Sequence, residues 1–332
     1  MSAPKSNVVY GLLAKVESAY GTYASPSSAS DGIQVAEYIE IERQYGFDGK
    51  RPAQPGNRGQ QRRVAPQGAT YRPTIKVEDK GPGAAYGASS FGKDYHALLL
   101  AGGMTGTLNS TTSWSYAPTL VTAAPTSVSL EYYCRANTAG NAEVWKAKGV
   151  YTDWVYEVAN AGPAMWTFNT FGVESTAPVE AAFPSITYSY GTIVPPVASP
   201  LTLTVNSVST LVIRSAKVEA KRVVQERFPD LNQAGAHAGF APGEFDPMFT
   251  FVCEAPLFAT SNLWSLHNAG TPFAASFGVG ATQYNKSAWA FAQAQVAEVK
   301  PSSDGPVPLL EVTCALHCST PTANDDLVFT AS

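Results

Sequence analysis

Apolar and polar residues alternate along many short segments of this chain, a pattern typical of strands that bury one face. The clearest segments are 37–43, 74–78, 128–134, 143–148, 150–158, 165–172, 201–205 and 327–330. Two stretches instead repeat their apolar residues at helical spacing, Asp94 to Gly102 and Asn262 to Gly270, and both end at Ala-Gly. The pattern predicts a mainly β fold with two short helices. The polar stretch 105–125 is expected to be a loop.

Each expected helix is preceded by hydroxyl side chains that can cap its first turn. Ser89 or Ser90 stands ahead of the first helix, and Thr260 or Ser261 ahead of the second. At the end of the first helix, the pair at 102–103 is expected to supply a left-handed glycine stop.

The segment 35–103 has a counterpart at 212–270. Each copy reads as a strand, a long loop rich in Pro and Gly, a return strand and a short helix. Later matched positions, such as Trp145 and Trp289, lie closer together than earlier ones, as deletions in the second copy would produce. The matched strands also keep the same inward and outward phase, which a slip of one residue would reverse. We therefore predict an internal duplication.

A length of 332 residues suits about two domains. We expect an N-terminal arm at 1–34, a first unit at 35–190, a Pro-rich linker at 191–200 and a second unit at 201–332. The linker holds three prolines, which cannot continue a strand ladder and favour extended chain. The arm is rich in Ser, Ala and Pro and is expected to pack on a neighbouring molecule. The predicted fold class is mainly β, with two tandem β-sandwich or barrel-like units that each carry one short helix.

Composition narrows the possible functions. Charged residues make up 14% of the chain, against about 25% in typical globular domains. So few charges are typical of a protein that hides much of its surface against partners, or of an extracellular β protein. The net charge of −4 argues against a surface that binds nucleic acid over its whole extent. No secretory segment and no apolar run long enough to span a membrane is found, so membrane insertion is not expected.

Candidate catalytic and metal-binding groups are sparse. No phosphate-binding loop is present, and the stretch 87–92 resembles a nucleophile elbow only loosely. Cys314, His317 and Cys318 are the one Cys/His cluster, but strand spacing separates the two thiols too far for one zinc ion. The cysteines on strands are expected to be buried, and His96 and His267 to lie on helix surfaces. We expect no catalytic residues, no metal and no cofactor.

Two long loops differ in charge. The first, 49–71, is basic and carries Arg51, Arg58, Arg62 and Arg63. The second, 229–247, has no Lys or Arg and carries Asp230, Glu244 and Asp246. Arginines suit phosphate contacts as well as pairing with acidic groups on a neighbour. One basic and one acidic loop on the same chain favour head-to-tail self-assembly over nucleic-acid binding.

In order and spacing, nearly the whole chain resembles the major tail tube proteins of long-tailed (siphovirus-type) bacteriophages. The resemblance rests on the opening segment Leu12 to Thr22, the two Ala-Gly helix ends and the closing segment Asn324 to Leu327. It implies a β-sandwich or barrel-like subunit with a flanking helix. Subunits of this family join their inner sheets around a lumen, and the rings stack. The resemblance implies no enzymatic activity, and passage of genomic DNA through the lumen without sequence specificity.

The resemblance also implies partners and a location. Two units in one chain favour a trimeric ring with pseudo-sixfold symmetry over a hexameric one, with the rings stacked helically. The loops 49–71 and 229–247 would then contact the adjacent ring. Tail terminator, tape measure and baseplate proteins are the implied partners, and the virion tail, assembled in the bacterial cytoplasm, is the implied location. Acidic groups on polar strand faces are candidates for the lumen, where they would repel DNA phosphates: Glu40, Glu42, Glu78, Glu219 and Glu254.

Two alternatives remain at this point. A secreted or surface β-sandwich binding module, such as an adhesin or carbohydrate binder, would use some of the 16 Tyr and 6 Trp for stacking on sugars. The lack of a secretory segment weighs against it. A hydrolase with a non-standard site is the third possibility.

Overall fold

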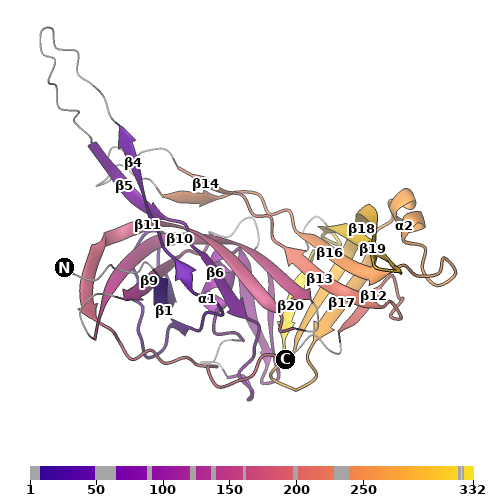
Figure 1. Cartoon of the computed structure of the whole chain (residues 1–332), viewed down its shortest axis with the longest axis horizontal. Helices are drawn as coiled ribbons and strands as arrows, with labels where there is room; N and C mark the ends of the chain where they lie inside the picture. The colour runs from indigo at the N-terminus through magenta and orange to yellow at the C-terminus, as the bar shows by residue number, and fades with distance from the viewer. Residues whose placement is uncertain are drawn as a thin grey trace, which may run out of the picture.

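The structure, a computed structural model, describes residues 8–48, 65–87, 92–119, 125–135, 140–159, 162–196, 201–227, 239–320, 323 and 325–332. It confirms the mainly β fold, with large antiparallel sheets. The described residues include two helices, α1 (His96–Ala101) and α2 (Leu263–Ala269). Figure 1 shows an elongated molecule in which α2 lies near one end of the long axis.

Seven strands form one sheet, which we call the polar sheet. Neighbouring strands are antiparallel throughout. Buried and partly exposed side chains alternate along each strand, so one face packs on the core and the other points outward. Across the sheet the order is β6 (Thr74–Glu78), β11 (Met165–Ala182), β10 (Asn141–Ala159), β13 (Ile213–Glu219), β16 (Met248–Glu254), β19 (Val307–His317) and β18 (Ser287–Asp304).

A second sheet shares β18 with the polar sheet. The first residues of β18 pair with β17 and β20, whereas Gln293 to Asp304 pair with β19. One long strand therefore belongs to both sheets, which pack over a common core. The order of the second sheet is β12 (Thr202–Val205), β17 (Phe273–Val279), β18, β20 (Val328–Ala331), β8 (Ser113–Pro118) and β7 (Met104–Ser110).

The polar sheet also extends sideways from β10. There β9 (Val128–Arg135) pairs with β10, and β1 (Val8–Val16) pairs with β9. Two short strands, β2 (Gly32–Ile33) and β3 (Ile39–Glu40), pair with β1.

The order of strands is the same in the two halves of the chain. In the first half it runs β6–β11–β10–β9–β1, and in the second β16–β19–β18–β17–β12. Each half has one helix after its first strand in this order, and Trp145 and Trp289 lie on the corresponding strands β10 and β18. The origin of the two halves by duplication and the boundaries of the units remain predictions.

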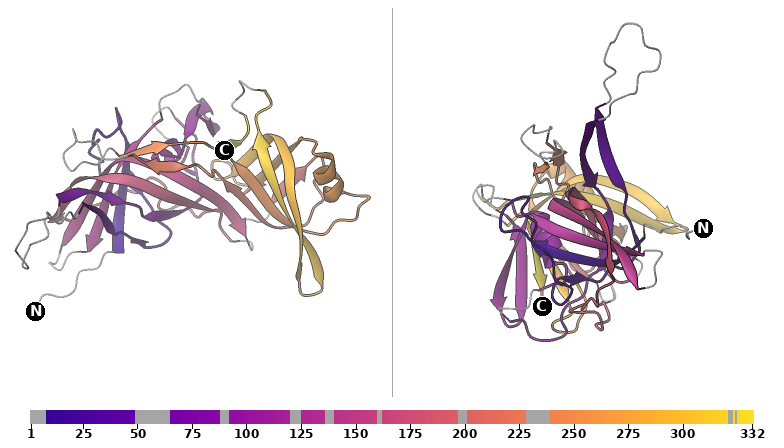
Figure 2. Two further views of the ribbon diagram at one scale, coloured as in Figure 1. Left: turned by 90° about the horizontal axis from the view of Figure 1, so that it is seen from above. Right: turned by 90° about the vertical axis from the view of Figure 1, so that its left-hand side faces the viewer.

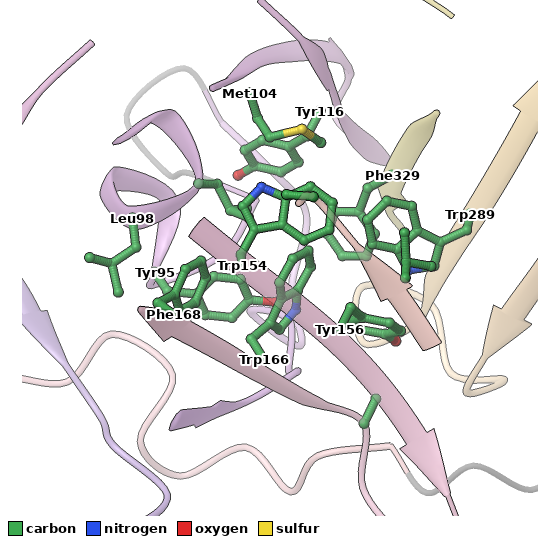
Figure 3. Close-up of a cluster of buried hydrophobic side chains, with 14 of the residues drawn as sticks. Tyr95, Leu98, Met104, Tyr116, Trp154, Tyr156, Trp166, Phe168, Trp289 and Phe329 are labelled. Atoms are coloured by element: carbon green, nitrogen blue, oxygen red, sulfur yellow. The ribbon is translucent and has the colours of Figure 1, made fainter. Parts of the chain in front are cut away.

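A single aromatic core lies beneath both halves. Trp154 and Trp166 of the first half pack on Trp289 of the second, with ring centroids 5.7 Å apart in both pairs. Phe329, near the C-terminus, lies 5.2 Å from Trp166. Figure 3 shows these rings meeting between the strands. Large aromatic side chains give the greatest burial per residue, so this cluster contributes strongly to the stability of the fold.

Two hairpins lie on the same side of the molecule. The first, β4 (Arg43–Asp48) with β5 (Ala65–Tyr71), stands away from the body (Figure 1, Figure 2). The second, β14 (Val224–Glu226) with β15 (Phe240–Pro242), lies across the outward faces of β10 and β11. Arg72 joins the two hairpins, because it forms an ion pair with Glu226 and lies over the ring of Phe240.

The N-terminal segment differs from its prediction. Residues 8–16, expected in an arm that reaches a neighbour, form β1 and pair with β9 of the same chain. Val9 and Leu12 are fully buried. This short apolar stretch, too small to form a core by itself, therefore packs into the core of its own chain. Glu17, just after β1, accepts four hydrogen bonds of 2.7–2.8 Å, from Gly21 N, Ser127 Oγ, Ser129 Oγ and Gly149 N.

Other local predictions also need correction. The expected loop at 105–125 contains β7 and β8, because Trp114 and Tyr116 point inward between small polar residues. Tyr95 is the N-cap of α1 and makes no side-chain capping hydrogen bond, whereas Asn262 caps α2 by accepting from Ser265 N.

At the end of α1 the left-handed residue is Gly103, with φ of 86°, and not Gly102. α2 ends at Ala269-Gly270, as expected, and Gly270 is left-handed with φ of 60°.

Candidate functional site

The outward face of the polar sheet brings polar side chains from both halves of the chain together. Glu78 lies opposite Met165, and Met165 lies opposite Glu157 on the next strand. Glu157 in turn lies opposite Lys217 of the second half. Residues directly opposite each other share a face, so this face is continuous from β6 to β18. We call it the polar sheet face, formed by Lys76, Glu78, Asn169, Thr167, Glu157, Lys217, Glu219, Thr250, Glu254, Thr313, Glu311, Glu298 and Lys300.

Negative groups outnumber positive ones on the polar sheet face. The residues named above hold six carboxylates and three ammonium groups, and Asp153, opposite Asn169, adds a seventh carboxylate. Arg214 pairs with Glu254 at 2.6 Å. Lys217 pairs with Glu219 of its own strand at 2.8 Å, and Lys300 pairs with Glu298 at the same distance. The face is therefore negative overall, although many of its charges are locally compensated. A surface of this kind repels a polyanion such as DNA, within a screening length of about 8 Å at physiological ionic strength.

The structure brings three of the five predicted lumen residues onto this face: Glu78, Glu219 and Glu254. Glu40 and Glu42 are exposed, but they lie on the segment that pairs with β1 and runs beside β6. Strand pairing does not place them in register with the polar sheet face. The sequence alternation identified the strand phases, whereas the order of strands across the sheet was needed to say which glutamates lie together.

The two predicted contact loops are only partly described. Arg51, Arg58, Arg62, Arg63 and Asp230 lie outside the described residues. Glu244 and Asp246 are exposed and follow β15. The described strands that flank the two loops, β4 with β5 and β14 with β15, lie on the same side of the molecule (Figure 1).

A buried ion pair, which sequence reasoning missed, lies where the two halves meet. Lys93 Nζ is 2.5 Å from Asp79 Oδ1, and both side chains are fully buried. Tyr95 and Tyr156 donate their hydroxyls to the same carboxylate at 2.7 and 3.0 Å. Burial alone would raise the pKa of Asp79, but the Lys93 ammonium and the hydrogen bonds outweigh it and hold the pKa below its usual value. Sealed from solvent, this group can hold the fold together but cannot act on a substrate.

Asp94, the next residue, is in a less favourable environment. Its Oδ2 is buried and has no hydrogen-bond partner within the described part of the chain. Burial raises the pKa of Asp94 to about 6, although the ammonium groups of Lys80 and Lys93 oppose the shift. One indication of this cluster is present in the sequence. An acidic residue and a lysine are adjacent at 79–80 and again at 93–94, at the two ends of one connecting segment in a chain with few charges.

The histidine and cysteine predictions have mixed outcomes. His96, expected on a helix surface, is instead buried 3.0 Å from the Tyr116 hydroxyl, and burial lowers its pKa to about 4. His267 is exposed, as expected. Cys253 and Cys314 are buried as predicted, and burial raises their pKa values to about 11 and 12. Within the described residues, His, Cys, Asp and Glu form no group of three that could hold a metal ion.

Exposed aromatic rings, which the carbohydrate-binding alternative requires, are scarce among the tryptophans. Trp114, Trp145, Trp154, Trp166 and Trp289 are buried, and Trp264 is 36% exposed. A hollow of about 440 Å³ on the second sheet is lined largely by small side chains such as Ala274, Ser276 and Ala290. Neither feature offers a platform of rings for stacking on sugars.

Comparison with known proteins adds no identification. No protein-family model matches the chain, and the comparison with curated proteins gives no match either. Within the described residues, both helices are too short to cross a membrane.

Proposed function

We propose that this chain is a structural subunit that assembles with copies of itself into stacked rings around a lumen, like the phage tail tube proteins it resembles. The observation that carries the proposal is the polar sheet face. It crosses seven strands from both halves of the chain beside the second hairpin, it is negative overall, and its opposite side packs on a single aromatic core.

The dimensions of this face suit the lining of a channel. Seven strands at about 4.8 Å spacing make a face roughly 29 Å across. Closing such faces from several copies into a ring would enclose a water-filled bore. Because the charges are mostly paired and the excess is negative, DNA would meet few attractive contacts and could slide. Three copies of a chain with two similar halves would give a ring with pseudo-sixfold symmetry.

The two hairpins support a role in stacking. Both leave the same side of the subunit, and Arg72 holds their bases together through Glu226 and Phe240. A ring of such subunits would present all of its hairpins to the same adjacent ring. Tail terminator, tape measure and baseplate proteins would be the partners at the ends and inside the tube. The location would be the virion tail, after assembly in the bacterial cytoplasm.

Electron microscopy of the purified protein tests this proposal. We expect rings or tubes of constant bore, with the polar sheet face toward the lumen in a reconstruction. A monomer that stays dispersed at high concentration and binds glycans would support the alternative binding module, and turnover of an ester or glycan panel would support a hydrolase. Either result would refute the tube.

Charge reversal in the first loop is a more specific test. Replacing Arg58, Arg62 and Arg63 together by Glu should leave the subunit folded, because charged pairs at a protein surface contribute little to stability and this stretch carries no apolar run that could belong to the core. Rings should still form, but their stacking should fail in negative-stain images. Tubes of normal length from this variant would show that the loop does not join adjacent rings.

A further inference from the structure

The chain contains an internal junction between its two halves. The segment 79–95, which connects β6 to α1, packs against the turn that precedes β18. Gly81 N donates to Asn285 Oδ1 at 2.9 Å, and Gly83 N donates to the carbonyl of Tyr284 at 3.2 Å. A side chain on Gly81 would collide with the backbone of Tyr284, so the two segments are in close contact.

Aromatic burial completes this junction. Tyr86 packs edge-to-face on Tyr284, with ring centroids 6.0 Å apart, and it is 2% exposed. Lys93 Nζ reaches across to Ser287 Oγ at 2.9 Å. The connecting segment of the first half therefore has its apolar side chain covered by the strand start of the second half.

The second half has the corresponding segment, 255–262, between β16 and α2, but there the apolar side chains are uncovered. Leu257 is 78% exposed, Phe258 71% and Trp264 of α2 36%. Moreover, the stretch from Ala255 to Asn285 contains no Lys, Arg, Asp or Glu. The exposed parts of these three side chains amount to roughly 400 Å², the size of the largest apolar patch on a typical monomer, which is often a functional surface.

The surface that corresponds to the turn before β18 is the start of β10, where Asn141 and Glu143 are half-buried. Asn141 at the start of β10 pairs with Ala182 at the end of β11. Close by, Val179 is 50% exposed and Phe183 41%. This end of the β10–β11 pair lies at the opposite end of the long axis from α2 (Figure 1). One chain thus has an uncovered apolar loop, 255–262, at one end, and exposed apolar side chains, Val179 and Phe183, at the other.

We propose that segment 255–262 and α2 of one copy pack on the start of β10 and the end of β11 of the next copy, repeating between chains the junction found within the chain. This inference rests on the proposed self-assembly and names the surfaces that carry it. The uncharged stretch favours a protein surface of the same kind over a nucleic acid or an anionic membrane. Because the two surfaces differ, the contact is head-to-tail and yields a ring where the rotation between copies closes.

The test uses the full chain with Leu257→Asp and Phe258→Asp combined. A charge buried at a central contact disrupts binding, so we expect the dissociation constant for self-association to rise at least about 30-fold by analytical ultracentrifugation. The control is Val194→Asp, at a residue 77% exposed that lies on neither surface, and it should associate like the wild type. Thermal unfolding of both variants should match the wild type, since the changed side chains are exposed.

Mixing two defective variants tests the head-to-tail geometry. Val179→Asp blocks the opposite surface, and it should also be monomeric alone. Mixed with the Leu257→Asp/Phe258→Asp variant, it should form one-to-one heterodimers, because a single intact contact remains. Failure to form heterodimers, or normal assembly of either variant, would overturn the proposed contact. If wild-type assemblies depend on Phe258 but contain no tubes, the contact stands and the tube proposal fails. If tubes form normally without Phe258, the tube stands and this contact is wrong.

Discussion

Replacement of Lys93 by Met tests how the two halves are held together. In the wild type, the Lys93 ammonium and the Asp79 carboxylate are 2.5 Å apart and fully buried, and the ammonium also reaches Ser287 and the ring of Phe329. Methionine keeps most of the apolar stem but leaves the carboxylate without its counter-charge. Breaking a buried pair in this way costs about 3–5 kcal/mol. The Tyr95 and Tyr156 hydroxyls remain as donors, so we expect the lower part of that range.

Urea unfolding at pH 7 measures this loss. The midpoint should fall for Lys93→Met, while Asp79→Asn in the same chain should recover part of the loss, because it removes the stranded charge. The double-mutant cycle should then give a coupling energy of about 1–3 kcal/mol. Lys300→Met is the matched control: its ammonium pairs with Glu298 in full contact with water, so the midpoint should not change.

Two results would refute this reasoning. A loss below about 1 kcal/mol for Lys93→Met would mean that the pair is not desolvated as described. Additive effects of the two substitutions would mean that the groups do not interact. The pH dependence gives an independent check. Because the pKa of Asp79 is lowered in the folded state, its contribution is present above the pKa of an ordinary carboxyl and is lost as the pH falls through the folded pKa.

Three further predictions concern single groups. The pKa of Asp94 is raised from 3.8 to about 6, so the charged carboxylate is penalised in the folded state; Asp94→Asn should stabilise the protein by up to about 3 kcal/mol above pH 6, fading towards pH 4, in unfolding experiments across pH. Glu17→Gln replaces one of the two carboxylate oxygens, which accept four hydrogen bonds, by an NH₂ donor. The free energy of unfolding, measured by thermal unfolding, should fall by about 2–3 kcal/mol. Gly239→Ala places a Cβ 2.0 Å from the Tyr20 hydroxyl at a φ of 89°, and should speed hydrogen exchange in β14 and β15, whereas Gly305→Ala, strained but in open space, should not.

Local patterns predicted much of the fold. The strands β6 and β9 were predicted in the right places, because Ile75 and Val77 or Leu130 and Tyr132 lie at alternate positions facing the core. Both helices were also predicted within two residues of their observed ends. In each case the information lies within a few consecutive residues, which is where alternation and capping act.

Long-range features were less accessible. Asp79 and Lys93 lie at either end of a connecting segment, and only the packed structure shows that their charges are buried together. β8 was missed although Trp114 and Tyr116 alternate with Ser113 and Ser115, and its place in a sheet is set by pairing with β7 and β20. Three glutamates of the polar sheet face, Glu78, Glu219 and Glu254, were named from the sequence. The continuity of the face depends on β10 pairing with β13 across the two halves, which no local pattern encodes.

The shared core has a mechanical consequence. Trp289 of the second half packs on Trp154 and Trp166 of the first, so neither half has a complete core of its own. A force applied to one half is therefore transmitted to the other, and the chain behaves as one rigid body. In a filament built from such subunits, bending would be taken up at the joints between copies, while each subunit keeps its shape.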